Sequence, residues 1–244
     1  MKTAFLVLAL AACSSSGNPM MGDDDDTPTP DSMIPNPTPG MLRLSGQATE
    51  TGLGGTSPVD GVAVAAFAKG DENTVLASGT TDADGNYTLT IEYEGDAYDG
   101  YVKATKDGYM DLYQYPPQAL TADSSDGNFN MITPGNKNQL NNIANGGQQP
   151  GMGLIGLMVA DEQGNPVAGA TVSSTPASGA YRYMAGNGFP SSTASATASV
   201  GVAFMFDVPS DVEVTVTATK AGMTFKAHTL KARADVFTST AIQP

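Results

Sequence analysis

The chain has 244 residues, including 28 glycines, 16 prolines, one histidine, one cysteine and no tryptophan, and its formal net charge is −14. This acidic balance argues against a nucleic-acid partner, because phosphate binding needs clustered lysine and arginine. It also argues against direct adhesion to an anionic lipid surface. The length suggests one or two domains, and a single cysteine excludes an internal disulfide framework.

The first residues have the pattern of an export signal. Lys2 supplies a positive charge, residues 4–10 form an apolar run, and two alanines precede Cys13. The apolar run is too short to span a bilayer, which takes about 20 residues. We therefore expect a cleaved signal peptide at 1–12.

Residues 10–13, Leu-Ala-Ala-Cys, resemble a bacterial lipobox. The resemblance implies that the Cys13 thiol is acylated and that the mature chain begins there, held to a membrane by its lipid. Ser14 follows the cysteine, where an aspartate often marks inner-membrane retention in such proteins. The resemblance therefore favours an outer-membrane lipoprotein.

Residues 13–40 are interpreted as a disordered tether. This stretch carries five aspartates, four of them consecutive at 23–26, several prolines and no basic residue. Mutual repulsion and proline favour an extended chain with nothing to bury. Adjacent aspartates in such a chain are not preorganised for a metal ion, so we interpret the acidic run as part of a spacer.

From residue 41 the chain changes to short alternating segments. In residues 86–93 and 212–219 every second residue is apolar, which is the period of a strand with one buried face. Turn signals separate such runs, and no long segment has a helical period. Many short strands with polar turns predict an all-β protein built of antiparallel sandwiches.

An internal repeat divides this region. Residues 58–64 (PVDGVAV) match residues 166–172 (PVAGATV), and residues 104–109 match residues 218–223. The copies begin roughly 110 residues apart, which suits two tandem domains. The predicted units are a first domain at 41–133, a linker at 134–152 and a second domain at 153–244. A short helix is expected in the linker, because Thr133 can cap it and Pro134 suits its first turn.

The same residues carry a family resemblance. Residues 164–172, 80–89 and 102–109 look like segments of carboxypeptidase regulatory-like domains. The resemblance implies a seven-stranded, transthyretin-like (prealbumin-like) sandwich with Ig-like architecture for each copy. In the family this module accompanies zinc peptidases and many surface proteins, and no catalytic domain is expected in this chain.

The second copy departs from the family pattern. It lacks the Asp-x-Asp-Gly turn and has residues 199–202 in its place, and Met223 replaces the usual tyrosine. Residues 173–199 form an insertion rich in Ser, Ala and Gly. The sequence therefore leaves the middle strands of this copy open.

The residues give little support for catalysis. Zinc hydrolysis needs about three protein ligands, usually with two or more histidines, and the chain has only His228, interpreted as a solvated residue on a strand. Residues 151–156 fit the letters of a dinucleotide fingerprint, but they follow a polar linker and open a strand. We expect that the protein is not an enzyme and has no cofactor, and calcium is the one ion for which the sequence offers a candidate site.

Asp82, Asp84 and Asn86 form that candidate calcium site. They resemble half of a helix-loop-helix calcium loop, but Tyr87 and Tyr93 occupy the places that require glycine and a bidentate glutamate. The alternative is a hairpin turn, in which Asp and Asn cap backbone amides. The turn is the favoured interpretation.

Seven of the nine tyrosines fall between residues 87 and 115. Aromatic faces stack on sugars and peptides, although they also pack cores. Alternation assigns two of the tyrosines to the core and the family pattern assigns a third to packing. The remaining four are the candidates for an exposed binding face: Tyr98, Tyr101, Tyr113 and Tyr115.

The sequence thus predicts a non-catalytic cell-surface lipoprotein that binds carbohydrate or another envelope polymer. This prediction rests on a carbohydrate-binding-like fold and on the tyrosine cluster. The alternative is a structural or scaffolding protein-interaction module. The expected partners are the membrane, through the lipid, and a polysaccharide or envelope protein, but no nucleic acid.

Overall fold

The computed structural model describes residues 40–52, 55–143, 148–185 and 190–244. The expected signal peptide, the lipidation site Cys13 and the tether as far as residue 39 lie outside the described residues and stay predictions. Residue 40, expected to end the tether, is the first residue of a strand.

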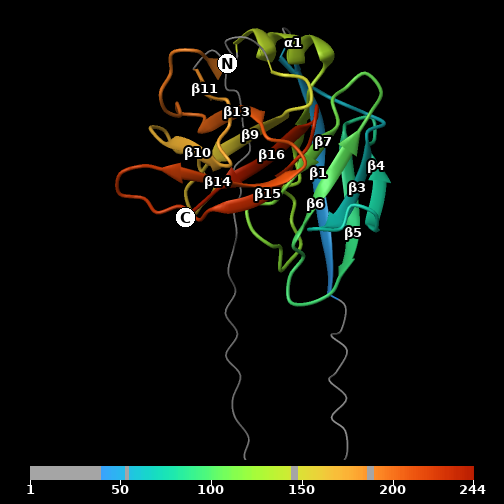
Figure 1. Ribbon diagram of the computed structural model, residues 1–244. Helices are drawn as coiled ribbons and strands as arrows, with labels where there is room; N and C mark the ends of the chain where they lie inside the picture. Colours follow the sequence, from blue (N-terminus) through green and yellow to red (C-terminus); the bar gives the residue numbers. More distant parts are fainter. Residues whose placement is uncertain (1–39, 53–54, 144–147, 186–189) are drawn as a thin grey trace, which may run out of the picture.

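The described chain is almost entirely β-structure (Figure 1), which confirms the all-β fold. The N-terminal half contains β1 (Gly40–Gly52), β2 (Gly55–Pro58), β3 (Ala63–Ala68), β4 (Val75–Thr80), β5 (Asn86–Tyr93), β6 (Gly100–Thr105), β7 (Leu112–Gln114) and β8 (Phe129–Met131). Helix α1 (Pro134–Ile143) follows, and the C-terminal half contains β9 (Gly153–Val159), β10 (Thr171–Thr175), β11 (Ala180–Met184), β12 (Pro190–Ser191), β13 (Val202–Val208), β14 (Val212–Thr219), β15 (His228–Ala232) and β16 (Phe237–Ile242).

The strands follow the alternating pattern of the sequence. In β5, Tyr87, Leu89 and Ile91 are buried while the residues between them are exposed. Val214 and Val216 of β14 are buried in the same way, but Val212, at the start of the strand, is 42% exposed. The period of two places one face of each strand in a core.

Three sheets build the molecule. One has the order β2-β1-β5, with β8 parallel to β1, and a second has the order β10-β14-β15. The third has nine strands in the order β12-β11-β13-β9-β16-β7-β6-β3-β4 and runs through both halves (Figure 1). Its two parts join where β16 pairs in parallel with β7, with Phe237 opposite Leu112.

The two cores lie on opposite faces of the nine-stranded sheet. One joins Val102 of β6 to Leu42 of β1 and continues to Phe237 at the joint. The other joins Tyr101 of β6 to Val214 of β14. Because neighbouring residues of a strand point to opposite faces, adjacent residues of β6 belong to different cores. Each small sheet therefore covers one end of the large sheet, on opposite sides.

Both halves contain the same buried threonine clasp. The Thr81 hydroxyl donates to the Val59 carbonyl at 2.8 Å and accepts from the Val62 amide at 2.9 Å. In the C-terminal half the corresponding bonds, of 2.7 and 2.9 Å, join Thr197 to Val167 and Ala170. The clasp satisfies buried backbone groups and shows that the repeat in the sequence is also a repeat of structure.

The turn before β13 has the same backbone form as the turn before β5. The second copy lacks the acidic residues of the Asp-x-Asp-Gly turn, but Gly201 has a φ of 68°, close to the 75° of Gly85. The Gly201 carbonyl accepts a bond from the Val159 amide at 2.8 Å, as the Gly85 carbonyl does from the Ala48 amide. The turn is therefore kept, and glycine rather than acid defines it, because only glycine adopts this φ without strain.

Helix α1 begins as predicted. The Thr133 Oγ1 accepts a hydrogen bond from the Asn136 amide at 3.2 Å, which is an N-cap arrangement, and Pro134 occupies the first turn. Leu140 packs against the core cluster that contains Leu42. The division of the chain into two domains at the proposed boundaries stays a prediction.

Gly201→Ala is expected to destabilise the protein more than Gly222→Ala. Both glycines have a left-handed φ, which costs alanine about 1–2 kcal/mol. A Cβ at Gly201 would also lie 2.6 Å from the Val159 oxygen and 3.0 Å from the Pro166 Cβ, whereas Gly222 has open space. Overpacking adds about 1–3 kcal/mol, so urea unfolding should separate the variants by that amount. Equal losses would contradict this account of the turn.

Candidate functional site

The structure buries three of the four tyrosines expected on an exposed face. The exposed fractions are 1% for Tyr98, 2% for Tyr101 and 4% for Tyr115, and Tyr113 is half-buried. The prediction that Tyr98, Tyr101 and Tyr115 are surface residues is therefore wrong. Tyr101, Tyr113 and Tyr115 gather at the joint between the halves, with ring centroids of neighbours 5.2 and 5.6 Å apart.

Strand direction explains this result. Val102 and Ala104 point into the N-terminal core, so Tyr101 and Lys103 point away from it. That outer face is not free, because Tyr101 and Tyr115 pack in the core cluster of the C-terminal half. The alternation identifies the face of β6 that carries Tyr101, but it contains no information about what covers that face.

Arg233 fills the centre of the tyrosine group. It follows β15, is 8% exposed, and its guanidinium carbon lies 3.9 Å from the ring centroid of Tyr113 and 4.8 Å from that of Tyr101. One terminal nitrogen donates to the Tyr115 hydroxyl at 3.1 Å, and the other donates to Glu72 Oε1 at 2.8 Å. Stacking on the rings and the bond to a carboxylate compensate the cost of removing the guanidinium charge from water.

Sequence reasoning missed Arg233 and Glu72. The two residues are 161 positions apart, they lie in different copies of the repeat, and neither belongs to a motif. One signal was available: Arg233 directly follows a strand whose residues Leu230 and Ala232 are buried. An arginine at such a place needs a compensating anion, but the sequence does not show which acid supplies it.

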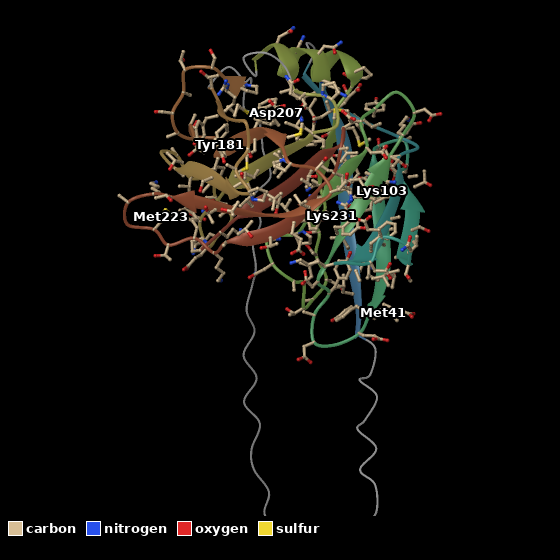
Figure 2. The ribbon with its side chains drawn as sticks, viewed as in Figure 1. Met41, Lys103, Tyr181, Asp207, Met223 and Lys231 are labelled. Carbon is tan, nitrogen blue, oxygen red and sulfur yellow. The ribbon has the colours of Figure 1, made fainter. Side chains whose placement is uncertain are left out.

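The charges at the joint stabilise one another. Lys231 Nζ lies 3.0 Å from the Glu72 oxygen that also accepts from Arg233, and Figure 2 shows Lys231 at the junction of the two halves. The bond from Lys231 and the charge of Arg233 lower the pKa of the Glu72 carboxyl. Burial opposes the charge of Arg233, but the Tyr115 hydroxyl and the Glu72 carboxylate hold its pKa above the usual value. Burial raises the pKa of Tyr101 to about 12, so its hydroxyl stays neutral.

His228 lies beside this cluster and is half-buried rather than solvated as expected. Its Nδ1 lies 2.8 Å from Thr240 Oγ1, and its ring meets Tyr115 edge-on with centroids 6.4 Å apart. Burial, followed by the charge of Lys69, lowers the pKa of the imidazole, while Asp99 opposes this. The joint therefore favours the neutral ring.

Tyr98 belongs to the N-terminal core rather than to the joint. Its hydroxyl lies 2.9 Å from the carbonyl oxygens of Phe67 and Tyr101. Burial raises the pKa of this hydroxyl above its usual value. Tyr98 therefore anchors the backbone at the end of β3 and the start of β6.

The candidate calcium residues form a tight turn. Asp82 Oδ1 accepts bonds from the amides of Asp84 at 3.0 Å and Asn86 at 2.8 Å. Asp161 caps the turn at 161–165 in the same manner. Within the described ranges, no group of three or more His, Cys, Asp or Glu side chains is arranged to hold a metal ion. The turn accounts for the aspartate, and calcium binding stays a prediction.

Two hollows open to solvent lie on the surface, one over β3, β4 and β6 and one beside the joint. One, of about 360 Å³, is lined by Ala63, Ala65 and Lys103, and another, of about 460 Å³, lies between Tyr109 and Asp235. No helix in the part of the chain that the structure describes is long and apolar enough to cross a membrane.

The chain is similar to several solved bacterial proteins. No protein-family model matches it, and no curated protein matches it. The minor pilin GBS52 of Streptococcus agalactiae is 12% identical, with a TM-score of 0.27 over 83% of this chain and 94% of the pilin. The shaft pilin SpaA of Lactobacillus rhamnosus GG is 11% identical, with a TM-score of 0.23 over 85% and 98%. The Bacillus anthracis TIE protein is 12% identical, with a TM-score of 0.26 over 83% of this chain and 34% of that one. At TM-scores below 0.5 these likenesses carry no argument, and the function is derived from the chain's own geometry.

Arg233→Met is expected to lower the free energy of unfolding by about 2–3 kcal/mol, the contribution of hydrogen bonds to a charged group. Arg233→Lys should recover little of this, because lysine lacks the planar fork. The matched control is Lys103→Met, which removes a partly exposed pair with Asp111 at 3.6 Å and should cost less than about 1 kcal/mol. Equal effects in urea unfolding would show that Arg233 does not hold the joint.

The stability of the protein is expected to fall as pH decreases through the histidine range. The folded pKa of His228 lies below its unfolded value of about 6.5, so the unfolded state binds the proton first. The contribution of the neutral ring is therefore complete above the unfolded pKa and is lost as pH falls toward the folded pKa. His228→Gln should flatten this part of the curve, because the chain has no other histidine. An unchanged slope would contradict the assignment.

Proposed function

We propose that this chain is a non-catalytic structural module of the cell surface, in which two joined β-sandwiches brace or space a protein partner. The observation that carries the proposal is the nine-stranded sheet that runs through both halves. Two sandwiches connected only by a free linker would move independently. A shared sheet with a buried cation at its joint instead keeps the distance across the module fixed.

The described residues at the end of the connection between the halves, 148–152, are also bound to the C-terminal half. The Gln149 amide donates to the Asp207 carboxylate at 2.7 Å, and the Gln148 side chain accepts from the Asp207 amide at 2.9 Å. The Gly151 amide lies 3.2 Å from both carboxylate oxygens of Asp235. These bonds fix the residues that lead into β9, so the sheet, the joint and the linker support one rigid arrangement.

The carbohydrate interpretation loses its main support. Stacking on a sugar needs an exposed aromatic face, whereas Tyr101 and Tyr115 are covered and Tyr113 already stacks on Arg233. The aromatic side chains of this cluster hold the two halves together. This use of the tyrosines favours the scaffolding alternative over polysaccharide binding.

The proposed location rests on the residues before residue 40. A signal peptide at 1–12 and acylation of Cys13 place the module on a lipid anchor at the outer membrane, with the Asp- and Pro-rich tether as a spacer. A rigid body on such a tether is suited to a role in bracing or spacing.

Spin-label distance measurements test the rigidity. Labels at Asp107→Cys and Ala221→Cys, in exposed turns of the two halves, are introduced together with Cys13→Ala, which removes the native thiol. We expect one narrow distance population, because the joint allows one arrangement, and a broader one when Arg233→Met is added.

Two outcomes would contradict the proposal. A broad distribution in the chain with intact Arg233 would show that the halves move independently. Binding to a polysaccharide panel that is lost on Tyr113→Ala would restore the carbohydrate interpretation. A matched Tyr109→Ala control separates a specific loss from a general loss of stability, because Tyr109 is half-buried and bonds to Glu50 at 2.9 Å.

A further inference from the structure

Strands β3 and β10 are counterparts in the internal repeat, but their outer edges differ. β3 pairs with β6 on one side and with β4 on the other, with Val64 opposite Gly79 and Ala66 opposite Ala77. β10 pairs with β14, the counterpart of β6, and this is its one strand partner among the described residues. The outer position that β4 occupies in the first half is therefore not filled by a strand in the second.

The reason lies in the path of β11. This strand follows β10 as β4 follows β3, but it pairs with β13 in the other sheet, with Tyr181 opposite Met205 and Tyr183 opposite Ala203. β11 therefore adds to the nine-stranded sheet instead of extending the three-stranded one. Its two tyrosines lie away from the joint between the halves, as Figure 2 shows for Tyr181.

Tyrosine hydroxyls replace the missing strand at the β10 edge. The Val172 amide donates to the Tyr183 hydroxyl at 3.1 Å, and the Ser174 amide donates to the Tyr181 hydroxyl at 3.2 Å. Val172 and Ser174 correspond in the repeat to Val64 and Ala66, which lie opposite Gly79 and Ala77 of β4. Two side-chain oxygens thus bond to the edge of β10, where the first half has a neighbouring strand.

The Tyr181 oxygen is held firmly in this place. It also accepts from the Ser178 amide at 3.2 Å and lies 3.0 Å from Ser174 Oγ, which lies 2.8 Å from Ser178 Oγ. Burial raises the pKa of the Tyr181 hydroxyl, but the hydrogen bonds with Ser174 and Ser178 together outweigh it, and the pKa is lowered. The cluster fixes the phenol over the edge of β10.

The β10 strand itself carries no charged residue and no proline. Natural edge strands often carry charge or proline, but β10 reads Thr-Val-Ser-Ser-Thr. Its outward backbone groups need partners because Val172 and Ser174 are buried, at 7% and 8% exposure. Among the described residues, the Val172 and Ser174 amides bond to the Tyr183 and Tyr181 hydroxyls, and Thr197 pairs with Gly169 and Ala170 just before the strand.

We propose that Tyr181 and Tyr183 form a latch that keeps the β10 edge closed, and that the opened edge pairs antiparallel with β10 of a second copy of this chain. The first half supplies the template, since β3 accepts an antiparallel strand at the same place. A two-fold axis through Ser173 puts Val172 of one copy opposite Ser174 of the other, so one edge is complementary to itself. This inference does not depend on the proposed function.

The test is sedimentation velocity of the full chain with Tyr181→Phe and Tyr183→Phe. This double variant keeps both rings but removes the two acceptors, and we expect self-association to tighten by about tenfold or more, since each unpaired amide favours a new acceptor. Adding Ser173→Lys should reverse the association, because the two lysines would face each other across the axis. An unchanged monomer, or association that Ser173→Lys does not reverse, overturns the proposal.

The matched control is Tyr87→Phe with Tyr98→Phe, which removes two buried hydroxyls that bond to carbonyls rather than to edge amides. It should lose stability without associating, and association of this control would overturn the proposal by showing that general loosening is enough. Where the double variant does not fold, Tyr183→Phe alone frees the Val172 amide and is compared with Tyr87→Phe. Sedimentation of Tyr183→Phe identical to that control then overturns the proposal.

Discussion

The parallel pairing of β16 with β7 is the contact on which the rest of the molecule depends. It joins two sheets into one and places the cores of the two halves on opposite faces of that sheet. As a result, the outer face of one half is the inner face of the other. Arg233 is stable in this arrangement because rings, a hydroxyl and a carboxylate from the N-terminal half surround its charge.

The two copies of the repeat share the features that satisfy or shape the backbone, but they differ in their surface residues. The threonine clasp and the glycine turn recur with nearly the same hydrogen bonds, although the acidic residues beside the first turn are absent from the second. These devices satisfy buried backbone groups or allow a left-handed φ, which few other residues can do. The aspartates of the first turn only cap backbone amides, and the second turn forms without them.

The difference between β4 and β11 shows how one topology accommodates two edges. In the N-terminal half, β4 pairs with the outer edge of β3. In the C-terminal half, β11 pairs with β13 in the opposite sheet, and a tyrosine hydroxyl from β11 bonds to the outer edge of β10. In the second half, phenol oxygens are the acceptors for the Val172 and Ser174 amides. A buried amide requires an acceptor of suitable geometry, and a well-placed phenol oxygen meets this requirement as a carbonyl does.

The sequence by itself determined the all-β class, the buried faces of β5 and β14, the repeat and the cap of α1. Each of these follows from local periodicity or from a single residue's conformational preference. It did not determine that Tyr101 and Tyr115 are covered, or that Glu72 compensates Arg233. Alternation assigns a side chain to one face of a strand, but only the packing of the second half over that face decides whether the side chain meets water, a ligand or an arginine from far along the chain.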